Sequence, residues 1–168
     1  MKMVSFEGDK RFRAYTGKTE ICGDTVSITV CLDDDELVMN DETAAKAEET
    51  MLKAAKEIAQ KADFIKQSIV TDDMISLAED WASSAEEDET SDRECYIMED
   101  GQKVFFPITN EDFTKSLHIA EAGVDVDKDF GYEEITVYFE CSPDYFAGHS
   151  LEVIVDPDGT VEEPDLVG

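Results

Sequence analysis

The chain has 168 residues, of which 42 are Asp or Glu and 14 are Lys or Arg, so its formal net charge is -28. Because 42% of the residues are hydrophobic, the composition excludes a disordered acidic protein and predicts a single folded domain over residues 1–168 with a strongly acidic surface. Such a surface repels nucleic acid and anionic membranes and attracts basic partners, although solubility or a high-salt habitat would account for the same charge.

The N-terminal residues lack the apolar core of a signal peptide, and no apolar run reaches the length of a membrane span. The four cysteines, Cys22, Cys31, Cys95 and Cys141, are scattered and form no Cys-x-x-Cys pair. We therefore expect reduced thiols in a cytoplasmic protein.

The N-terminal region predicts β structure, with candidate strands at 11–15 and 26–32 and with Gly17 and Gly23 as breakers. Alternate residues of the second strand are apolar, which indicates one buried face. The four adjacent acids at 33–36 predict a solvated turn, because consecutive residues of an extended chain do not converge on one metal ion.

A long helix is predicted from Asp41 to about Ile69, with Asp41 or Thr43 as its N-cap. Its apolar residues recur at spacings of three and four, which places them on one stripe. They are Ala44, Ala47, Met51, Ala55, Ile58, Ala62, Ile65 and Ile69.

A second helix is predicted to begin at Thr71, with acids in its first turn, where the helix dipole favours them. Its expected buried stripe consists of Met74, Leu77, Ala78 and Trp81. Together the two segments predict a helical hairpin.

The acidic segment 83–92 is interpreted as a mobile connection. Apolar runs on either side of Asp100-Gly101 predict a hairpin, because this dipeptide is typical of tight turns. Thr109 caps a short predicted helix that ends near Ser116, and an extended segment follows over 117–126.

The C-terminal region predicts two half-buried strands, at 135–141 and 151–155, in which apolar and polar residues alternate. The sequence Asp156-Pro157-Asp158-Gly159 then favours a tight turn. The order of elements predicts an α+β fold: a mainly antiparallel sheet with the two-helix hairpin packed on one face.

From Trp81 onward the chain resembles bacterial families of unknown function that are marked by a Phe-x-Gly-His-x-[Ile/Leu]-x-Val strand. The matching residues are Phe146-Ala147-Gly148-His149-Ser150-Leu151-Glu152-Val153, followed by an Asp-x-Asp-Gly turn. Ala147 departs from the pattern, where an aromatic residue is expected. Some members of such families have been proposed as immunity proteins of toxin systems. The resemblance implies a cytoplasmic bacterial domain that binds another protein, and it carries over no catalytic residue.

His149 is the most specific local candidate for a functional residue, and strand register directs its side chain into the fold with that of Leu151. One interpretation is a general base that Asp144 or Tyr145 orients. The interpretation that we favour is a buried or half-buried imidazole held by a hydrogen-bond acceptor, because no Ser or Cys lies in a recognisable nucleophile motif.

The alternating acids Asp125, Asp127 and Asp129 have the spacing of a calcium loop. That loop requires Gly at its sixth position and Glu at its twelfth, where this chain has Phe130 and Thr136. We therefore favour an acidic hairpin turn. With two histidines and no paired cysteines, we expect no zinc site, and we expect no cofactor.

The leading functional hypothesis is a non-enzymatic domain that binds a basic protein, in the manner of an immunity or antitoxin-like inhibitor. Glu133, Glu134, Glu162 and Glu163 are its expected contact residues, because no Lys or Arg follows Lys128. One alternative is a small hydrolase or ligand-binding enzyme centred on His149 and Asp144. Another is a structural domain whose acidic surface provides solubility. We expect neither a nucleic-acid nor a membrane partner, and the sequence leaves the oligomeric state open.

Overall fold

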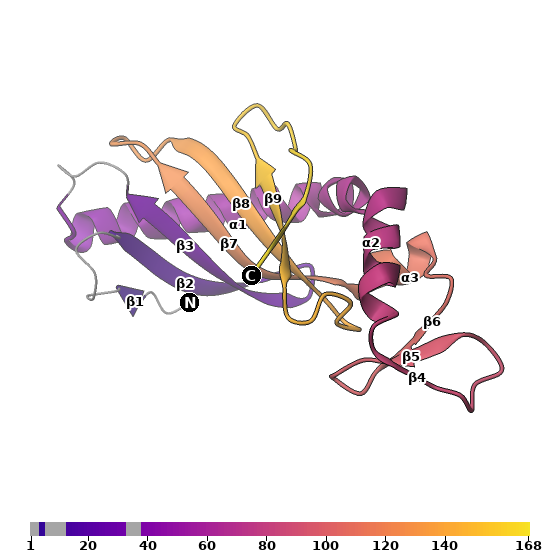
Figure 1. Ribbon diagram of the computed structural model, residues 1–168. Helices are drawn as coiled ribbons and strands as arrows, with labels where there is room; N and C mark the ends of the chain where they lie inside the picture. Colours follow the sequence, from indigo (N-terminus) through magenta and orange to yellow (C-terminus); the bar gives the residue numbers. More distant parts are fainter. Residues whose placement is uncertain (1–3, 6–12, 33–37) are drawn as a thin grey trace.

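The computed structural model describes residues 4–5, 13–32 and 38–168 and shows an α+β fold (Figure 1). A seven-stranded sheet has the order β1-β2-β3-β7-β8-β9-β10, and a long helix, α1, lies across one of its faces. The sheet consists of β1 (Val4–Ser5), β2 (Ala14–Ile21), β3 (Asp24–Leu32), β7 (Leu117–Val126), β8 (Tyr132–Cys141), β9 (Ser150–Val155) and β10 (Asp165–Val167). The predicted turn at 33–36 and the start of the first predicted strand lie outside the described residues.

All neighbouring strands of this sheet are antiparallel except β3 and β7, which run parallel with Ser27 opposite Glu121 and Leu32 opposite Val126. The mainly antiparallel sheet is therefore confirmed, and β7 to β10 form the meander that the sequence predicts. Gly17, predicted as a breaker, lies inside β2 opposite Ile28, so that prediction is wrong. Gly23, the other predicted breaker, lies in the turn between β2 and β3, as expected.

Helix α1 (Asp41–Ile69) has the predicted bounds, but its cap is Asn40, not Asp41 or Thr43. The Asn40 carboxamide oxygen accepts hydrogen bonds from the amides of Glu42 (2.9 Å) and Thr43 (3.0 Å). The Thr43 hydroxyl in turn accepts one from the Asn40 amide (2.9 Å), which completes a capping box. It also lies 2.8 Å from the Tyr15 hydroxyl, so the helix start is fixed to β2.

The hydrophobic core lies between α1 and the sheet. Ala47, Met51, Ile58, Ile65 and Ile69 of α1 are almost fully buried against alternate residues of the strands. Burial of each large aliphatic side chain contributes about 1.5–3 kcal/mol, so this layer is the main source of stability. Although α1 has 29 residues, no helix of the described ranges is long and apolar enough to cross a bilayer.

Helix α2 (Asp72–Ala82) begins one residue after the predicted start, Thr71, which is its N-cap, and it turns away from the axis of α1 at the end of the sheet (Figure 1). The predicted two-helix hairpin on one face is therefore not confirmed, because it is α1 that extends along the sheet. The fully buried residues of α2 are Ile75, Ala78 and Ala82. Of the predicted stripe, Ala78 is buried, and Met74, Leu77 and Trp81 are half-buried against the core.

A second, three-stranded sheet projects at this end of the molecule. It consists of β4 (Glu86–Glu87), β5 (Cys95–Ile97) and β6 (Lys103–Phe105), and the short helix α3 (Asn110–Ser116) follows. Segment 83–92, predicted as a mobile connection, thus contains a strand. Asp88 in this segment pairs with Lys103 at 2.6 Å, and this contact, with hydrogen bonds from Thr90, lowers the pKa of Asp88 to about 2.

Candidate functional site

The sheet face turned away from α1 carries a continuous row of polar side chains. In this row Glu121 of β7, Tyr138 of β8 and Glu152 of β9 lie directly opposite one another. The row continues to Lys18 and Ser27 at one end and to Asp165 at the other. Strand alternation produces most of it, because every member except Asp165 neighbours a buried residue along its strand.

Tyr138 lies at the centre of this row and is half-buried. Burial, a hydrogen bond with Glu152 and the nearby charges of Glu152, Asp125 and Glu121 together raise the pKa of its phenol to about 12, and burial is the largest cause. Negative charge thus surrounds an aromatic ring that solvent still reaches.

Further acids extend this surface along the strands. Asp125 pairs with Glu134 across β7 and β8, and Glu140 pairs with His118 at the other end of the same strands. We call the following set the acidic sheet face: Glu121, Asp125, Glu134, Tyr138, Glu140, Glu152 and Asp165. All of its members are half-buried or exposed.

The structure separates the four acids that the sequence proposes as contact residues. Glu134 belongs to the acidic sheet face, whereas Glu133 lies at a register shift of β8. Glu162 follows an isolated bridge, and its amide donates to the Ile154 carbonyl. Glu163 lines a shallow pocket beside the start of α2. Of the acids that the sequence analysis did not propose, Glu121, Asp125, Glu140 and Glu152 lie in segments that it predicted as extended, so the alternation of polar and apolar residues was the available signal; Asp165 lies outside them.

His149 directly precedes β9 and is half-buried. Its Nδ1 atom lies 2.9 Å from the Phe146 carbonyl oxygen, and its ring packs edge-on against Trp81. Phe146, which is fully buried, also contacts Trp81, with ring centroids 6.1 Å apart. These contacts hold the loop between β8 and β9 against α2.

Asp144 and Tyr145, the candidate partners of His149, lie in the same loop between β8 and β9 and stabilise that loop. The Asp144 carboxylate accepts a hydrogen bond from the Phe146 amide at 3.2 Å. Tyr145 is buried beside Phe113, and burial raises the pKa of its phenol to about 12. The side chains of His149 and Asp144 thus each bond to the backbone of Phe146: the imidazole to its carbonyl oxygen and the carboxylate to its amide.

The acids of the predicted calcium-like segment build the turn between β7 and β8. One carboxylate oxygen of Asp127 accepts hydrogen bonds from the amides of Asp129 (2.8 Å) and Gly131 (2.9 Å). Asp125 faces the sheet surface, away from this turn. Within the residues that the structure describes, no group of three or more His, Cys, Asp or Glu side chains has an arrangement that could hold a metal.

Comparison with known proteins places this fold in a family. A family model described as an uncharacterized protein conserved in bacteria matches residues 2–166. The chain belongs to this family, DUF2262. No curated protein and no solved structure matches the chain. Membership of DUF2262 confirms a bacterial domain of unknown function, whereas the relation to immunity proteins stays a prediction.

Proposed function

We propose that this DUF2262 protein is a non-enzymatic binding domain that recognises a basic protein through the acidic sheet face. The row of Glu121, Tyr138 and Glu152 is the observation that carries the proposal. It presents carboxylates on both sides of an accessible aromatic ring, on rigid strands of the main sheet.

Two physical arguments support this assignment. The first is electrostatic: neighbouring carboxylates on one surface create a negative potential that speeds the approach of a cationic partner by about 10- to 1,000-fold. The second concerns Tyr138, because tyrosine is enriched among the few residues that dominate binding energy in protein interfaces. A half-buried phenol held by Glu152 loses little conformational freedom when it is covered.

The proposed partner is a bacterial toxin, and the proposed role is inhibition of that toxin. The sequence pattern from Phe146 to Val153 supports this narrower statement through its resemblance to predicted immunity proteins. In the fold this segment supplies β9, which carries Glu152 of the acidic sheet face. A gene for a basic toxin beside the gene for this protein is the expected genomic context.

The proposal is tested by affinity capture from the source bacterium, followed by binding kinetics at several salt concentrations. Glu121→Lys combined with Glu152→Lys should slow association by at least about tenfold. The matched control is Glu48→Lys combined with Glu49→Lys, which changes the net charge equally on the exposed side of α1. Tyr138→Ala should speed dissociation, with a loss of about 2 kcal/mol of binding free energy.

Association that slows with salt and with the sheet-face reversal, but not with the control, is the expected result. A captured partner that is not basic would contradict the proposal. So would a partner whose association rate changes with neither salt nor the sheet-face substitutions. Equal effects of the two double reversals would show that net charge matters and that this face does not, which would also contradict the proposal.

A further inference from the structure

The half of the chain that follows α1 is poor in bases, and its bases are not spread evenly. After Lys66 the sequence contains four Lys or Arg residues: Arg93, Lys103, Lys115 and Lys128. Three of them line one cleft of about 320 Å³ between the small sheet, α3 and the loop between β8 and β9. Lys128 lies apart, in the turn between β7 and β8.

We propose that this cleft, lined by Arg93, Lys103 and Lys115, binds a small molecule that carries a carboxylate or phosphate group. Each cation comes from a different segment. Arg93 precedes β5, Lys103 begins β6, and Lys115 lies in the last turn of α3. Convergence of three such side chains in a strongly acidic chain is the chemistry that recognises an oxyanion.

Ser142 and Tyr145 also line the cleft, and a hydroxyl can donate to an oxyanion. Ser116 lines it too, but its hydroxyl donates to the Phe113 carbonyl at 2.7 Å. Tyr145 keeps its proton at neutral pH, because burial raises the pKa of its phenol to about 12. The cleft therefore combines charged donors at its rim with neutral donors on its wall.

The cations keep donors for a ligand even though each already has a contact. Lys103 pairs with Asp88 at 2.6 Å and Lys115 with Glu111 at 2.5 Å, but an ammonium group has three donors. Arg93 stacks on Phe105, with its guanidinium carbon 5.4 Å from the ring centroid, and donates to the Phe106 carbonyl at 3.4 Å. A guanidinium has five N–H donors, so Arg93 keeps others for a ligand.

Cross-links between the walls hold the cleft open in advance of binding. Gln102, in the turn between β5 and β6, donates a hydrogen bond to the Ser142 hydroxyl at 2.9 Å. The Asp144 amide donates to the Asp100 carboxylate of the same turn at 3.3 Å. The small sheet and the loop between β8 and β9 are thus joined on the side of the cleft, which reduces the ordering cost of binding.

Asp112 is the acidic residue among those that line the cleft, and it opposes an anion. Its carboxylate accepts a hydrogen bond from the Thr109 hydroxyl at 2.6 Å, so it is held at the start of α3. The net charge of the whole protein also opposes an anion, but salt at physiological strength limits this repulsion to about 8 Å. Direct contacts with the three cations act inside that range.

The test is a two-dimensional amide NMR titration of the whole protein with inorganic phosphate and, separately, with acetate, at constant ionic strength. Saturable shifts in the amides of Arg93, Lys103, Ser116 and Ser142 are the expected result. Arg93→Gln should weaken the affinity by about tenfold, and Lys128→Gln, which removes the same charge elsewhere, should leave it unchanged. Glu111→Gln should strengthen it by about two- to fivefold, because Lys115 is then released from its ion pair.

Saturation by phosphate alone would assign a phosphate group, and saturation by acetate alone would assign a carboxylate. Shifts that stay linear with both anions, or an equal loss of affinity in Arg93→Gln and Lys128→Gln, would overturn the proposal. Since Arg93 and Lys128 are both exposed, thermal unfolding of the two variants should match that of the parent and exclude misfolding as the cause.

Discussion

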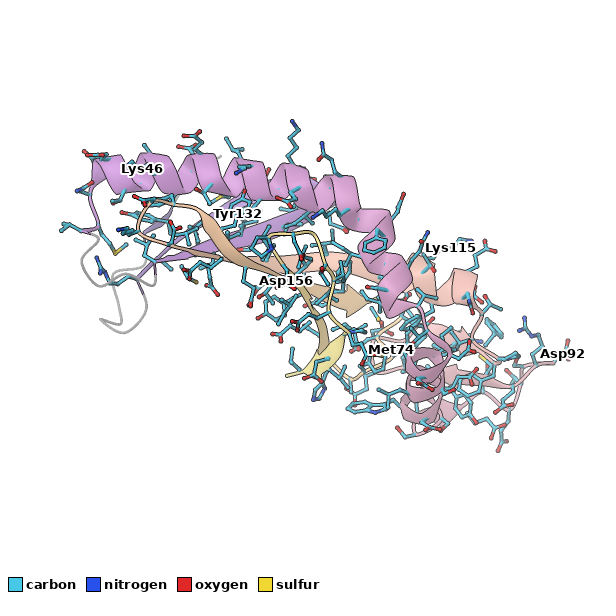
Figure 2. All side chains as sticks on the ribbon, turned by 90° about the horizontal axis from the view of Figure 1, so that it is seen from above. Lys46, Met74, Asp92, Lys115, Tyr132 and Asp156 are labelled. Carbon is cyan, nitrogen blue, oxygen red and sulfur yellow. The ribbon has the colours of Figure 1, made fainter. Side chains whose placement is uncertain are left out.

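The imidazole of His149 lies edge-on to the indole of Trp81, with ring centroids 5.1 Å apart and planes at 72°. This contact joins the start of β9 to the last turn of α2, which are 68 positions apart in the sequence. Together with the hydrogen bond from His149 to the Phe146 carbonyl, it orients the loop that places Phe146 in the core. Figure 2, seen from above, shows α2, with Met74 labelled, beyond the end of α1.

His149→Ala should lower the free energy of unfolding by about 1–2 kcal/mol, from one hydrogen bond and one aromatic contact. The measurement is urea-induced unfolding followed by the fluorescence of Trp81, the single tryptophan of the chain. His118→Ala is the control, because His118 is exposed and its pair with Asp24 lies at the surface. That change should cost less than about 1 kcal/mol. Equal losses in the two variants would contradict a specific role of the contact with Trp81.

Alkaline pH should destabilise the protein through its buried tyrosines. Burial, followed by the charges of neighbouring acids, raises the pKa of Tyr138 to about 12, whereas an unfolded tyrosine titrates near pH 10. Between these values the folded state binds more protons than the unfolded state, so stability falls as the pH rises through this window.

Urea unfolding at intervals from about pH 9 to about pH 12 measures this loss. Tyr138→Phe should flatten the alkaline decline, because it removes one titrating group. Tyr132 and Tyr145, whose pKa values are also raised by burial, should maintain the remaining slope. An unchanged slope in Tyr138→Phe would show that its phenol titrates alike in both states.

The elements that the sequence predicts well are those with a long periodic pattern. Helix α1 has its predicted bounds because eight apolar residues recur along one stripe, and strand β7 has its predicted bounds because a helix cap and a turn delimit it. The parallel pairing of β3 with β7 was not predicted. Pairing partners depend on the long connection through α1 and α2, and local periodicity carries no information about that connection.

Prediction of the candidate sites was limited in the same way, because local periodicity does not show which strands pair with one another. Most acids of the acidic sheet face alternate with apolar residues within predicted strands, so each could be identified singly, but their alignment in one row requires the strand order. Arg93, Lys103 and Lys115 are separated along the chain and belong to no motif. Their convergence depends on the small sheet and on the link between Gln102 and Ser142, which composition does not reveal.

The parallel pairing of β3 and β7 is held at one end by Asp24. One oxygen of its carboxylate accepts a hydrogen bond from the Ile119 amide at 3.0 Å, and the other lies 3.1 Å from Nδ1 of His118. Asp24→Ala should lower the free energy of unfolding by about 1–3 kcal/mol, because the Ile119 amide loses its acceptor. Asp24→Asn, which keeps one carbonyl oxygen, should recover part of this loss.

Hydrogen exchange of the Ile119 amide provides a local measurement for this prediction. Exchange should be faster in Asp24→Ala than in Asp24→Asn, and faster in both variants than in the parent protein. If the Ile119 amide exchanges at the same rate in all three proteins, Asp24 does not secure this end of the pairing. His118→Ala should leave the exchange rate close to that of the parent, because the hydrogen bond to the Ile119 amide uses the other carboxylate oxygen.

The four free cysteines should differ strongly in reactivity, because the thiolate is the reactive species. Burial raises the pKa of the Cys141 thiol to about 12, although a hydrogen bond with Ser116 opposes the shift. Its thiolate fraction at pH 8 is then on the order of 10⁻⁴. Cys95 is buried, whereas Cys22 is exposed at the turn between β2 and β3.

A disulfide-exchange reagent at pH 8 should therefore label the native protein in a fast phase that Cys22→Ser removes and Cys141→Ser retains. Urea should make the slow thiols accessible, and loss of the fast phase in Cys141→Ser would contradict the burial of that thiol.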